Sequence, residues 1–245
     1  MPEWPAASII PAVPTPKYFA LIPAAGTGSR IGEDRPKQYL ALDQRPMLHY
    51  AIARFCNHPG IARTSVVLGL DDTWFSRFDW SPFSENLDVL RCGGATRAQS
   101  VLNGLSALAP TVEENDWILV HDAARPCLSD AMIDTLIRNL GVDAVGGLLA
   151  LPVSDTLKRG DKERVIATEP RDKFWLAQTP QMFRFGLLWR ALRAADLENV
   201  TDEASAVELI GLQPKLVVSD ASNLKVTHRS DLALAEMLLR HSKGK

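Results

Sequence analysis

Two closely spaced glycines and two cations follow the first short apolar run of the chain. The run covers residues 18–22 and is typical of a buried parallel strand. Gly26 and Gly28 come directly after it, and such glycines can adopt backbone conformations closed to other residues and turn successive N–H groups toward an anion. Arg30 and Lys37 add two positive charges beside those amides. We therefore expect this loop to bind a triphosphate.

The spacing excludes two familiar phosphate loops. The dinucleotide fingerprint G-x-G-x-x-G needs a glycine at position 31, where this chain has Ile31. The P-loop needs Gly-Lys five residues after its first glycine, but Ile31 and Glu33 stand at those distances from Gly26 and Gly28. A G-x-G pair alone is more typical of a plain strand-to-helix turn, so other motifs must decide between the two interpretations.

The composition indicates an ordinary soluble globular protein. The 245 residues are 46% hydrophobic and 23% charged, which is enough for one sizeable α/β core, and the net charge of −2 argues against a nucleic-acid or membrane binder. Cys56, Cys92 and Cys127 form no C-x-x-C pair, which argues against a zinc site or disulfide framework and fits a reducing cytoplasm. The longest apolar stretch, at 145–153, is too short to span a membrane.

The first 17 residues differ from the rest of the chain. Five prolines precede Lys17, and no basic segment precedes an apolar core, so we expect an extended, poorly ordered tail and no signal peptide. No repeat or interior linker interrupts residues 18–245, and we expect them to form a single domain.

Apolar runs alternate with helical periodicity beyond this tail. We predict strands at 18–22, 65–70, near 89–90, at 117–120 and at 144–151. Apolar spacing predicts helices around 98–108 and 133–140, with Ser129 capping the second, and a last helix after 223–227. This alternation predicts an α/β fold, with a mostly parallel sheet and helices on both faces.

Residues 152–173 break the pattern. They are polar and rich in turn residues, with Gly160 and Asp161 between strand-like segments at 153–157 and 164–168. We interpret them as a protruding β-arm. An isolated hairpin is only marginally stable in water, so we expect this arm to pack on a second subunit and make a homodimer. The alternative is a surface hairpin on a monomer.

The loops after the other strands carry further candidate residues, and ligands of open α/β sheets bind at that edge. Gly93 and Gly94 would let a flat base lie against the backbone, while Arg97 and Ser100 add directional polar groups at a helix start. His121 has no suitably placed Ser or Cys nucleophile beside it, so we expect a structural imidazole.

An acid and a base stand three residues apart after the strand at 117–120. Asp122 and Arg125 could face a ligand, although alone they are more typical of a local ion pair that fixes a turn. Lys225, flanked by Leu224 and Val226, is likewise typical of the exposed residue of an edge strand.

Eight motifs in order resemble the 2-C-methyl-D-erythritol 4-phosphate cytidylyltransferases of non-mevalonate isoprenoid synthesis. The resemblance covers about residues 18–239. The motifs are PAAGTGSR at 23–30, PKQY at 36–39, GGATR at 93–97 with SV at 100–101, VHDAARP at 120–126, PVSDT at 152–156, QTPQ at 178–181, TDEAS at 201–205 and NLKVT at 223–227. Any one is weak, whereas eight in the family's order are highly specific.

The resemblance implies a cytoplasmic, CTP- and Mg²⁺-dependent nucleotidyltransferase with a Rossmann-like sheet, dimeric through its arm. In such enzymes a phosphate oxygen of the substrate attacks the α-phosphate of CTP, giving a cytidine diphospho product and pyrophosphate. Mg²⁺ would bind mainly through the CTP phosphates, because it usually keeps several waters and needs few protein ligands. Because the chain ends at Lys245, we expect no second enzyme of the pathway to be fused to it.

The resemblance also implies site residues by motif position. Transition-state stabilisation falls to Arg30 and Lys37. The nucleotide side is formed by Ala24, Ala25, Gly26, Gly28, Gly93, Gly94 and Ser100. The hydroxyl groups of the polyol would face Asp122, Arg125 and Thr201. Its phosphate would be positioned by Arg171, Thr179 and Lys225. Three of these residues would reach across from the partner subunit, namely Thr156, Arg171 and Thr179.

Elementary electrostatics favours the same roles. Two phosphates repel each other, and the attacking phosphate is already a nucleophile near neutral pH, so catalysis reduces to alignment and charge neutralisation by Arg, Lys and Mg²⁺. Ile31 and Ala95 depart from the residues that the family often has there, and the segment at 169–174 departs most.

Two alternatives remain open at this point. One is a cytidylyltransferase for another polyol phosphate, such as ribitol 5-phosphate. The other is a non-catalytic nucleotide-binding module, against which the presence of Arg30, Lys37 and Lys225 counts.

Overall fold

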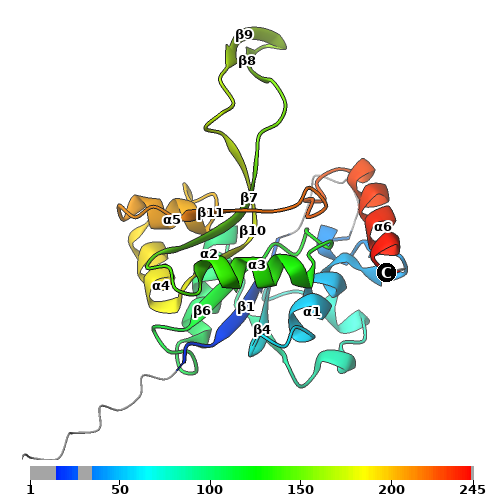
Figure 1. Cartoon of the computed structure of the whole chain (residues 1–245). Coiled ribbons are helices and arrows are strands. Elements are labelled where there is room, and N and C mark those ends of the chain that lie inside the picture. Colours follow the sequence, from blue (N-terminus) through cyan, green and yellow to red (C-terminus); the bar gives the residue numbers. More distant parts are fainter. Residues whose placement is uncertain (1–14, 27–34, 244–245) are drawn as a thin grey trace, which may run out of the picture.

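A mostly parallel sheet forms the centre of the molecule (Figure 1). The computed structural model describes residues 15–26 and 35–243. Within them seven strands follow the order β11-β7-β10-β6-β1-β4-β5. The strands are β1 (Tyr18–Pro23), β4 (Arg63–Leu68), β5 (Leu87–Arg91), β6 (Trp117–Val120), β7 (Gly146–Pro152), β10 (Trp175–Arg184) and β11 (Lys215–Val218). Only β10 runs against its neighbours in this described sheet, pairing antiparallel with β6 and β7.

The apolar runs of the sequence became strands because they lie between two layers of helix. The predicted strand at 117–120 is β6 without change, and the other four predicted runs differ from β1, β4, β5 and β7 by one or two residues at an end. The strands β10 and β11 were not predicted. Pro180 has no N–H to donate, and the pairing of β10 with β7 shifts register between Ala177 and Gln181, so the sequence around it does not read as a central strand.

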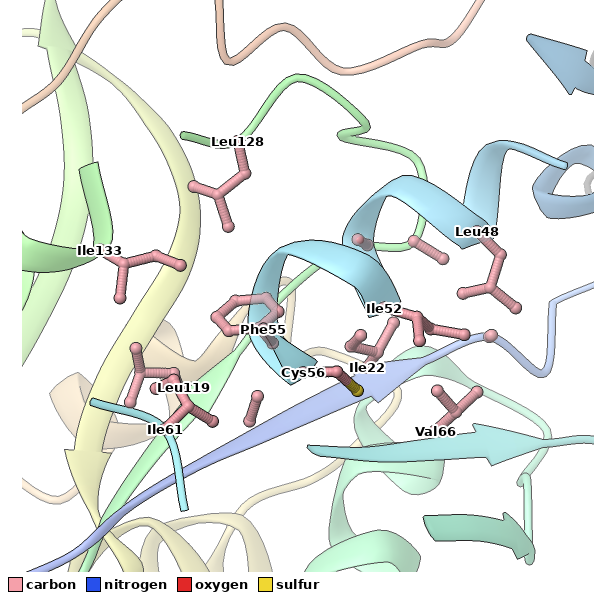
Figure 2. Packing of buried hydrophobic residues seen from close by; sticks show 14 of the residues in the cluster. Ile22, Leu48, Ile52, Phe55, Cys56, Ile61, Val66, Leu119, Leu128 and Ile133 are labelled. Carbon is pink, nitrogen blue, oxygen red and sulfur yellow. The ribbon is translucent and has the colours of Figure 1, made fainter. Parts of the chain in front are cut away.

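Helices cover both faces of the sheet, as predicted. They are α1 (Met47–Cys56), α2 (Arg97–Leu108), α3 (Asp130–Leu140), α4 (Phe185–Ala194), α5 (Glu203–Leu209) and α6 (Arg229–Lys243). The helices α1 and α3 pack on one face, where Phe55 and Ile133 meet Leu119 of β6 (Figure 2). On the other face α2, α4 and α5 pack around Leu21 and Phe183. Ser129 caps α3 by accepting from the N–H of Met132 at 3.3 Å, as predicted.

A smaller apolar cluster joins the C-terminal helix to the segment after β1. Short elements lie in this segment and beyond β4: the 3-10 helices η2 (Lys37–Tyr39), η3 (Phe75–Arg77) and η4 (Ser81–Phe83), and the strands β2 (Ala41–Leu42) and β3 (Arg45–Pro46). Leu42 and Met47 pack with Ala235 of α6 and with Val226, which is fully buried just before that helix. This cluster brings the segment that carries Lys37 beside the segment that carries Lys225.

The predicted arm is present and stands away from the body of the molecule (Figure 1). It consists of β8 (Leu157–Asp161) and β9 (Arg164–Glu169), which pair antiparallel. The second strand lies where we predicted it, but the first strand and the turn do not. The turn is formed by Lys162 and Glu163, with φ of 44° and 64°, whereas Gly160 and Asp161 lie inside β8.

The Pro-rich tail up to residue 14 lies outside the described residues. No helix in the described part of the chain is long and apolar enough to cross a membrane.

Candidate active site

A cavity of about 470 Å³ opens where the carboxyl ends of β1 and β6 meet the start of α2. This volume is in the usual range for small-molecule sites. Its walls come from five separate segments of the chain. The lining residues are Pro23, Ala24, Ala25, Gly26, Lys37, Gln38, Gly94, Ala95, Thr96, Arg97, Ser100, Asp122, Ala123, Ala124 and Lys225.

The wall after β1 is held from both sides. The N–H of Ala24 donates to the carbonyl of Val67 in β4 at 2.8 Å, and the carbonyl of Ala24 accepts from the side chain of Gln38 at 2.8 Å. Lys37 lines the cavity next to Gln38, and its Nζ donates to the carbonyl of Val226 at 2.8 Å. Gly28 and Arg30 fall between residues 27 and 34, outside the described residues.

Three glycines lie in or behind the cavity wall, and the packing of the protein does not require glycine equally at each of them. A Cβ at Gly93 would meet Ala25 Cβ at 2.3 Å and the carbonyl oxygen of Leu68 at 2.8 Å, so the packing demands glycine there. At Gly94 it would meet Gln99 Cγ at 2.2 Å. At Gly26 it would meet no atom of the described residues within 4 Å, and the φ of Gly26 is not left-handed. Gly26 therefore does not use the left-handed conformation that is open to glycine, and no described atom fills the space in front of it.

The loop at 93–96, where we expect a flat base to lie, is fixed by the hydroxyl of Ser100 at the start of α2. Ser100, 2% exposed, accepts from the N–H of Gly94 at 3.0 Å and donates to the carbonyl of Thr96 at 2.9 Å. Thr96 in turn caps α2 by accepting from the N–H of Gln99 at 3.0 Å. The direct effect of Ser100 is thus to shape the loop at 93–96, in which small residues leave room for a flat ring.

Asp122 is the buried centre of a charge cluster on the far wall. Its Oδ1 accepts from Arg97 Nε at 2.8 Å, and its Oδ2 accepts from Lys225 Nζ at 2.6 Å. Burial alone would raise the pKa of Asp122, but Arg97 and Lys225 outweigh burial and hold this pKa well below its usual range. Asp122 is therefore a carboxylate at any pH near neutral, and it holds both cations at the edge of the cavity.

A second acid supports this cluster from behind. Glu203, 1% exposed at the start of α5, accepts from Arg97 NH1 at 2.7 Å and from Arg97 NH2 at 3.1 Å. The paired bonds fix the plane of the guanidinium, and removal of Arg97 would leave the buried Glu203 carboxylate without its paired cation. Arg97 is therefore clamped between two carboxylates that come from different loops.

The residues beneath Asp122 form an internal network. Arg125 lies 4.0 Å from Asp122, and its guanidinium donates to the carbonyls of Asn223 and Ala177 at 2.7 and 3.2 Å. The Thr179 hydroxyl accepts from the N–H of Asp122 at 3.0 Å and lies 3.0 Å from His121 Nδ1. Burial lowers the pKa of His121 to about 4, so the imidazole is neutral. These contacts fix the loop after β6, and His121 has the structural role that we expected.

The cavity suits an anionic ligand. Lys37, Arg97 and Lys225 line it, and Asp122 is the carboxylate among its described lining residues. No group of three or more His, Cys, Asp or Glu side chains that could hold a metal ion occurs among the described residues. With cations from three segments around a space that small residues also line, the arrangement can neutralise a polyphosphate and hold a flat ring beside it.

Comparisons with known proteins agree with this geometry. The family model for 2-C-methyl-D-erythritol 4-phosphate cytidylyltransferase matches residues 18–241. The enzymes of that name from Dechloromonas aromatica and Nitrosospira multiformis are 57% and 56% identical, over 93% and 92% of this chain and 100% and 99% of their own lengths. The chain belongs to the 2-C-methyl-D-erythritol 4-phosphate cytidylyltransferase family. It is thus a nucleotidyltransferase.

Solved structures of the family share the fold. The crystal structure of a 4-diphosphocytidyl-2C-methyl-D-erythritol synthase matches with a TM-score of 0.82 at 41% identity, covering 93% of this chain and all of its own. The cytidylyltransferase from Francisella tularensis matches with a TM-score of 0.78 at 34% identity, over 91% of this chain and 99% of its own. The Rossmann-like fold implied by the motifs is thereby confirmed.

Most of the residues to which the motif positions assigned a role come together at the cavity. Those on its walls are Ala24, Ala25, Gly26, Lys37, Gly94, Ser100, Asp122 and Lys225. Gly93 supports the wall from behind, and Lys225 lies in an irregular segment rather than an edge strand. Arg125 and Thr179 lie beneath Asp122, where protein groups occupy the polar atoms described above.

Three further residues lie away from the cavity walls. Thr156 and Arg171 belong to the arm, where Arg171 is exposed and donates to the carbonyl of Ser154. Thr201 is exposed ahead of α5, with its Oγ 3.4 Å from Ser205 Oγ. Thr179 was expected to reach across a subunit boundary with the two arm residues. In this chain it is 4% exposed in β10 and serves its own Asp122.

Two residues of the site carried no predicted role. Gln38 stands within the PKQY motif, and Glu203 within TDEAS. An acid in the first turn of a helix reads as an ordinary complement to the helix dipole, so nothing local marks Glu203 as buried. The partner of Glu203 is Arg97, which lies 106 positions earlier in the sequence. Only the fold shows that these two residues meet.

Proposed function

We propose that this chain transfers the cytidylyl group of CTP to 2-C-methyl-D-erythritol 4-phosphate, releasing pyrophosphate and giving 4-diphosphocytidyl-2-C-methyl-D-erythritol for isoprenoid precursor synthesis. The observation that carries the proposal is the cavity itself, in which cations from three separate segments surround a space walled by small residues. Such a site can align two phosphates that would otherwise repel each other.

In this proposal one part of the cavity binds CTP and another part binds the acceptor. Lys37, together with Arg30, neutralises charge on the CTP phosphates as the bond to the leaving pyrophosphate breaks. The loop at 93–96 takes the cytosine. Lys225 pairs with the phosphate of the acceptor, and Asp122 keeps Lys225 in place through the 2.6 Å contact in addition to meeting the acceptor's hydroxyls. No proton has to be removed from the attacking phosphate, which suits a cavity with one lining carboxylate among the described residues.

We propose that Mg²⁺ enters bound to the phosphates of CTP. Both oxygens of Asp122 accept from cations, so the carboxylate is poorly disposed to hold a metal ion directly. Mg²⁺ usually retains waters and takes substrate phosphates as ligands, which fits this donor set. When bound, the ion would neutralise charge on the triphosphate. We also expect the enzyme in the cytoplasm, because its nucleotide substrate is made there.

We further propose a homodimer joined by the arm. The support is the exposure of apolar side chains on it, with Val165 65% and Ile166 59% exposed in this single chain. In a dimer, Arg171 and Thr156 of one subunit would reach the acceptor phosphate in the other.

The test is pyrophosphate release from pairs of substrates. Purified protein with Mg²⁺ is incubated with each nucleoside triphosphate and with either methylerythritol phosphate or ribitol 5-phosphate. We expect CTP with methylerythritol phosphate to give the highest kcat/KM by at least about tenfold, because buried polar contacts discriminate strongly. A preference for ribitol 5-phosphate would favour the other polyol-phosphate enzyme, and CTP binding without turnover would favour a non-catalytic module.

A further inference from the structure

Gln38 joins two parts of the cavity wall that are distant in the sequence. Its Nε2 donates to the carbonyl of Ala24 at 2.8 Å and to the carbonyl of Gly26 at 3.0 Å. The side chain is 7% exposed, and a primary amide has two N–H donors, so both are used on these carbonyls. The loop after β1 is therefore attached to η2 through one side chain.

The helix η2 is itself held at both ends. Lys37 Nζ reaches the carbonyl of Val226, and the hydroxyl of Tyr39 donates to Asp72 Oδ2 at 2.6 Å. Tyr39 is fully buried and stacks on Phe78 with ring centroids 5.8 Å apart. A 3-10 helix of three residues has little rigidity of its own, so these contacts determine where it lies. Because η2 is fixed in this way, the hydrogen bonds of Gln38 also fix the position of Ala24 and Gly26.

The orientation of the carbonyls matters because the expected ligand is an anion. A carbonyl oxygen near a phosphate repels it, whereas an N–H attracts it. In a trans peptide the C=O and the following N–H point in opposite directions, so a carbonyl of Ala24 held toward Gln38 turns the N–H of Ala25 the other way. Ala25 and Gly26 line the cavity.

We propose that Gln38 is a positioning residue for the nucleotide: it holds the carbonyls of Ala24 and Gly26 away from the phosphates and fixes the loop relative to Lys37. This inference rests on the proposed function, because it takes CTP as the ligand of the loop. The acceptor side of the cavity, around Asp122 and Lys225, has no contact with Gln38 among the described hydrogen bonds.

The first experiment compares the two substrates in Gln38→Met, which keeps the length of the side chain and removes both donors. The matched control is Gln213→Met, at an exposed position. We expect kcat/KM for CTP to fall roughly thirtyfold, as for the loss of two hydrogen bonds of ordinary strength, with the KM for methylerythritol phosphate within about twofold of wild type. A fall below about threefold, or an equal rise in both KM values, overturns the proposal.

The second experiment uses pH in Gln38→Glu. A protonated carboxyl can donate one hydrogen bond to a carbonyl, whereas the carboxylate donates none and repels both oxygens. Burial raises the pKa of such a carboxyl. We therefore expect the ratio of variant to wild-type kcat/KM for CTP to be at least about fivefold higher at pH 6 than at pH 8, while the ratio for Gln38→Met stays constant. Equal ratios at both pH values for Gln38→Glu contradict the proposal.

Controls separate this inference from the function on which it rests. Calorimetric titration with Mg²⁺ and CTP, without acceptor, should show weaker binding in Gln38→Met even if the acceptor were misassigned. Wild-type protein that binds CTP but releases no pyrophosphate would contradict the proposed function alone. Melting temperatures of both variants should lie within about 5 °C of wild type, and loss of folding in both would make Gln38 a residue of the fold and overturn the proposal.

Discussion

Some residues of this site are required by the fold and others by the ligand. Substitution of glycine by alanine at two positions can distinguish these requirements, because stability and activity are measured separately. Gly26→Ala should leave the melting temperature at or slightly above that of wild type, because the new Cβ meets no described atom within 4 Å and alanine restricts the unfolded chain. The same methyl group would project into the space that CTP needs. We expect kcat/KM for CTP to fall at least about tenfold, measured by pyrophosphate release.

Gly93→Ala is the contrasting variant. Its Cβ would lie 2.8 Å from the carbonyl oxygen of Leu68, so we expect destabilisation of roughly 1–3 kcal/mol in urea. If Gly26→Ala destabilised the protein as much as Gly93→Ala does, glycine at position 26 would be a requirement of the fold.

His121 supplies a prediction about pH. Its pKa of about 4 lies below the value of about 6.5 in the unfolded chain, so the unfolded state binds more protons between these limits. Stability is therefore fully present above pH 6.5 and falls as the pH drops toward 4. From pH 7 to pH 5 this group alone should lower the free energy of unfolding by roughly 2 kcal/mol.

The measurement is urea unfolding at both pH values for wild type and His121→Gln. The variant should lose roughly 2 kcal/mol less on acidification than wild type, whatever its absolute stability. His241→Gln, at an exposed position, should retain the wild-type difference. An unchanged difference in His121→Gln would mean that another group takes up the proton.

Helices and strands could be predicted from the sequence where the pattern of apolar residues matches the residues that the fold buries. The four apolar residues of β6 are buried on both faces and read as a strand without ambiguity. The arm turn was misplaced because Gly160 and Asp161 are the expected turn residues, whereas the chain turns at Lys162 and Glu163, both with positive φ. Two-residue hairpin turns match the twist of their strands in this conformation, and that geometry outweighed residue preference.

The candidate site was predictable only in part, for a similar reason. Motif position located Lys37, Asp122 and Lys225, and for Asp122 the place directly after a predicted strand pointed the same way. The clamp of Glu203 on Arg97 could not be read, since it depends on how α5 is held by α4 and by Gln181 of β10. A motif records which residues matter together without saying which of them touch the ligand.

The TDEAS motif illustrates this at the start of α5. Asp202 accepts from the N–H of Ser205 at 2.9 Å, and the Ser205 side chain returns the contact in a capping box. Asp202→Ala should destabilise the protein by about 1 kcal/mol, while Asp202→Ser, which can still cap, should recover most of this. Because α5 carries Glu203, the KM for the acceptor should rise in Asp202→Ala more than in Asp202→Ser. Equal stability of both variants in thermal unfolding would contradict the capping role.

The whole molecule presents an arm that its own body does not cover. Arg171 and the apolar residues Val165 and Ile166 are exposed on it, and Phe174 at its base is 50% exposed. Exposed apolar side chains on a two-stranded ribbon are expected to pack against something, and a two-fold axis would let each arm cover the other subunit. Arg171 would then complete the site of the partner. In such a dimer, activity would depend on a pair of chains, which mixing of variants can test.

Arg171→Ala and Lys37→Ala should each lower kcat about a hundredfold, because each removes a cation from charge that develops in the transition state. When the two proteins are mixed under conditions that exchange subunits, a hybrid dimer contains one site with Lys37 and the partner subunit's Arg171 intact. Activity should therefore return to at most about half of wild type per hybrid dimer. Subunit exchange is verified by co-purification of two different tags. If exchange occurs and both parents are inactive but no activity returns, Arg171 serves its own chain. The arm would then join subunits without sharing their sites.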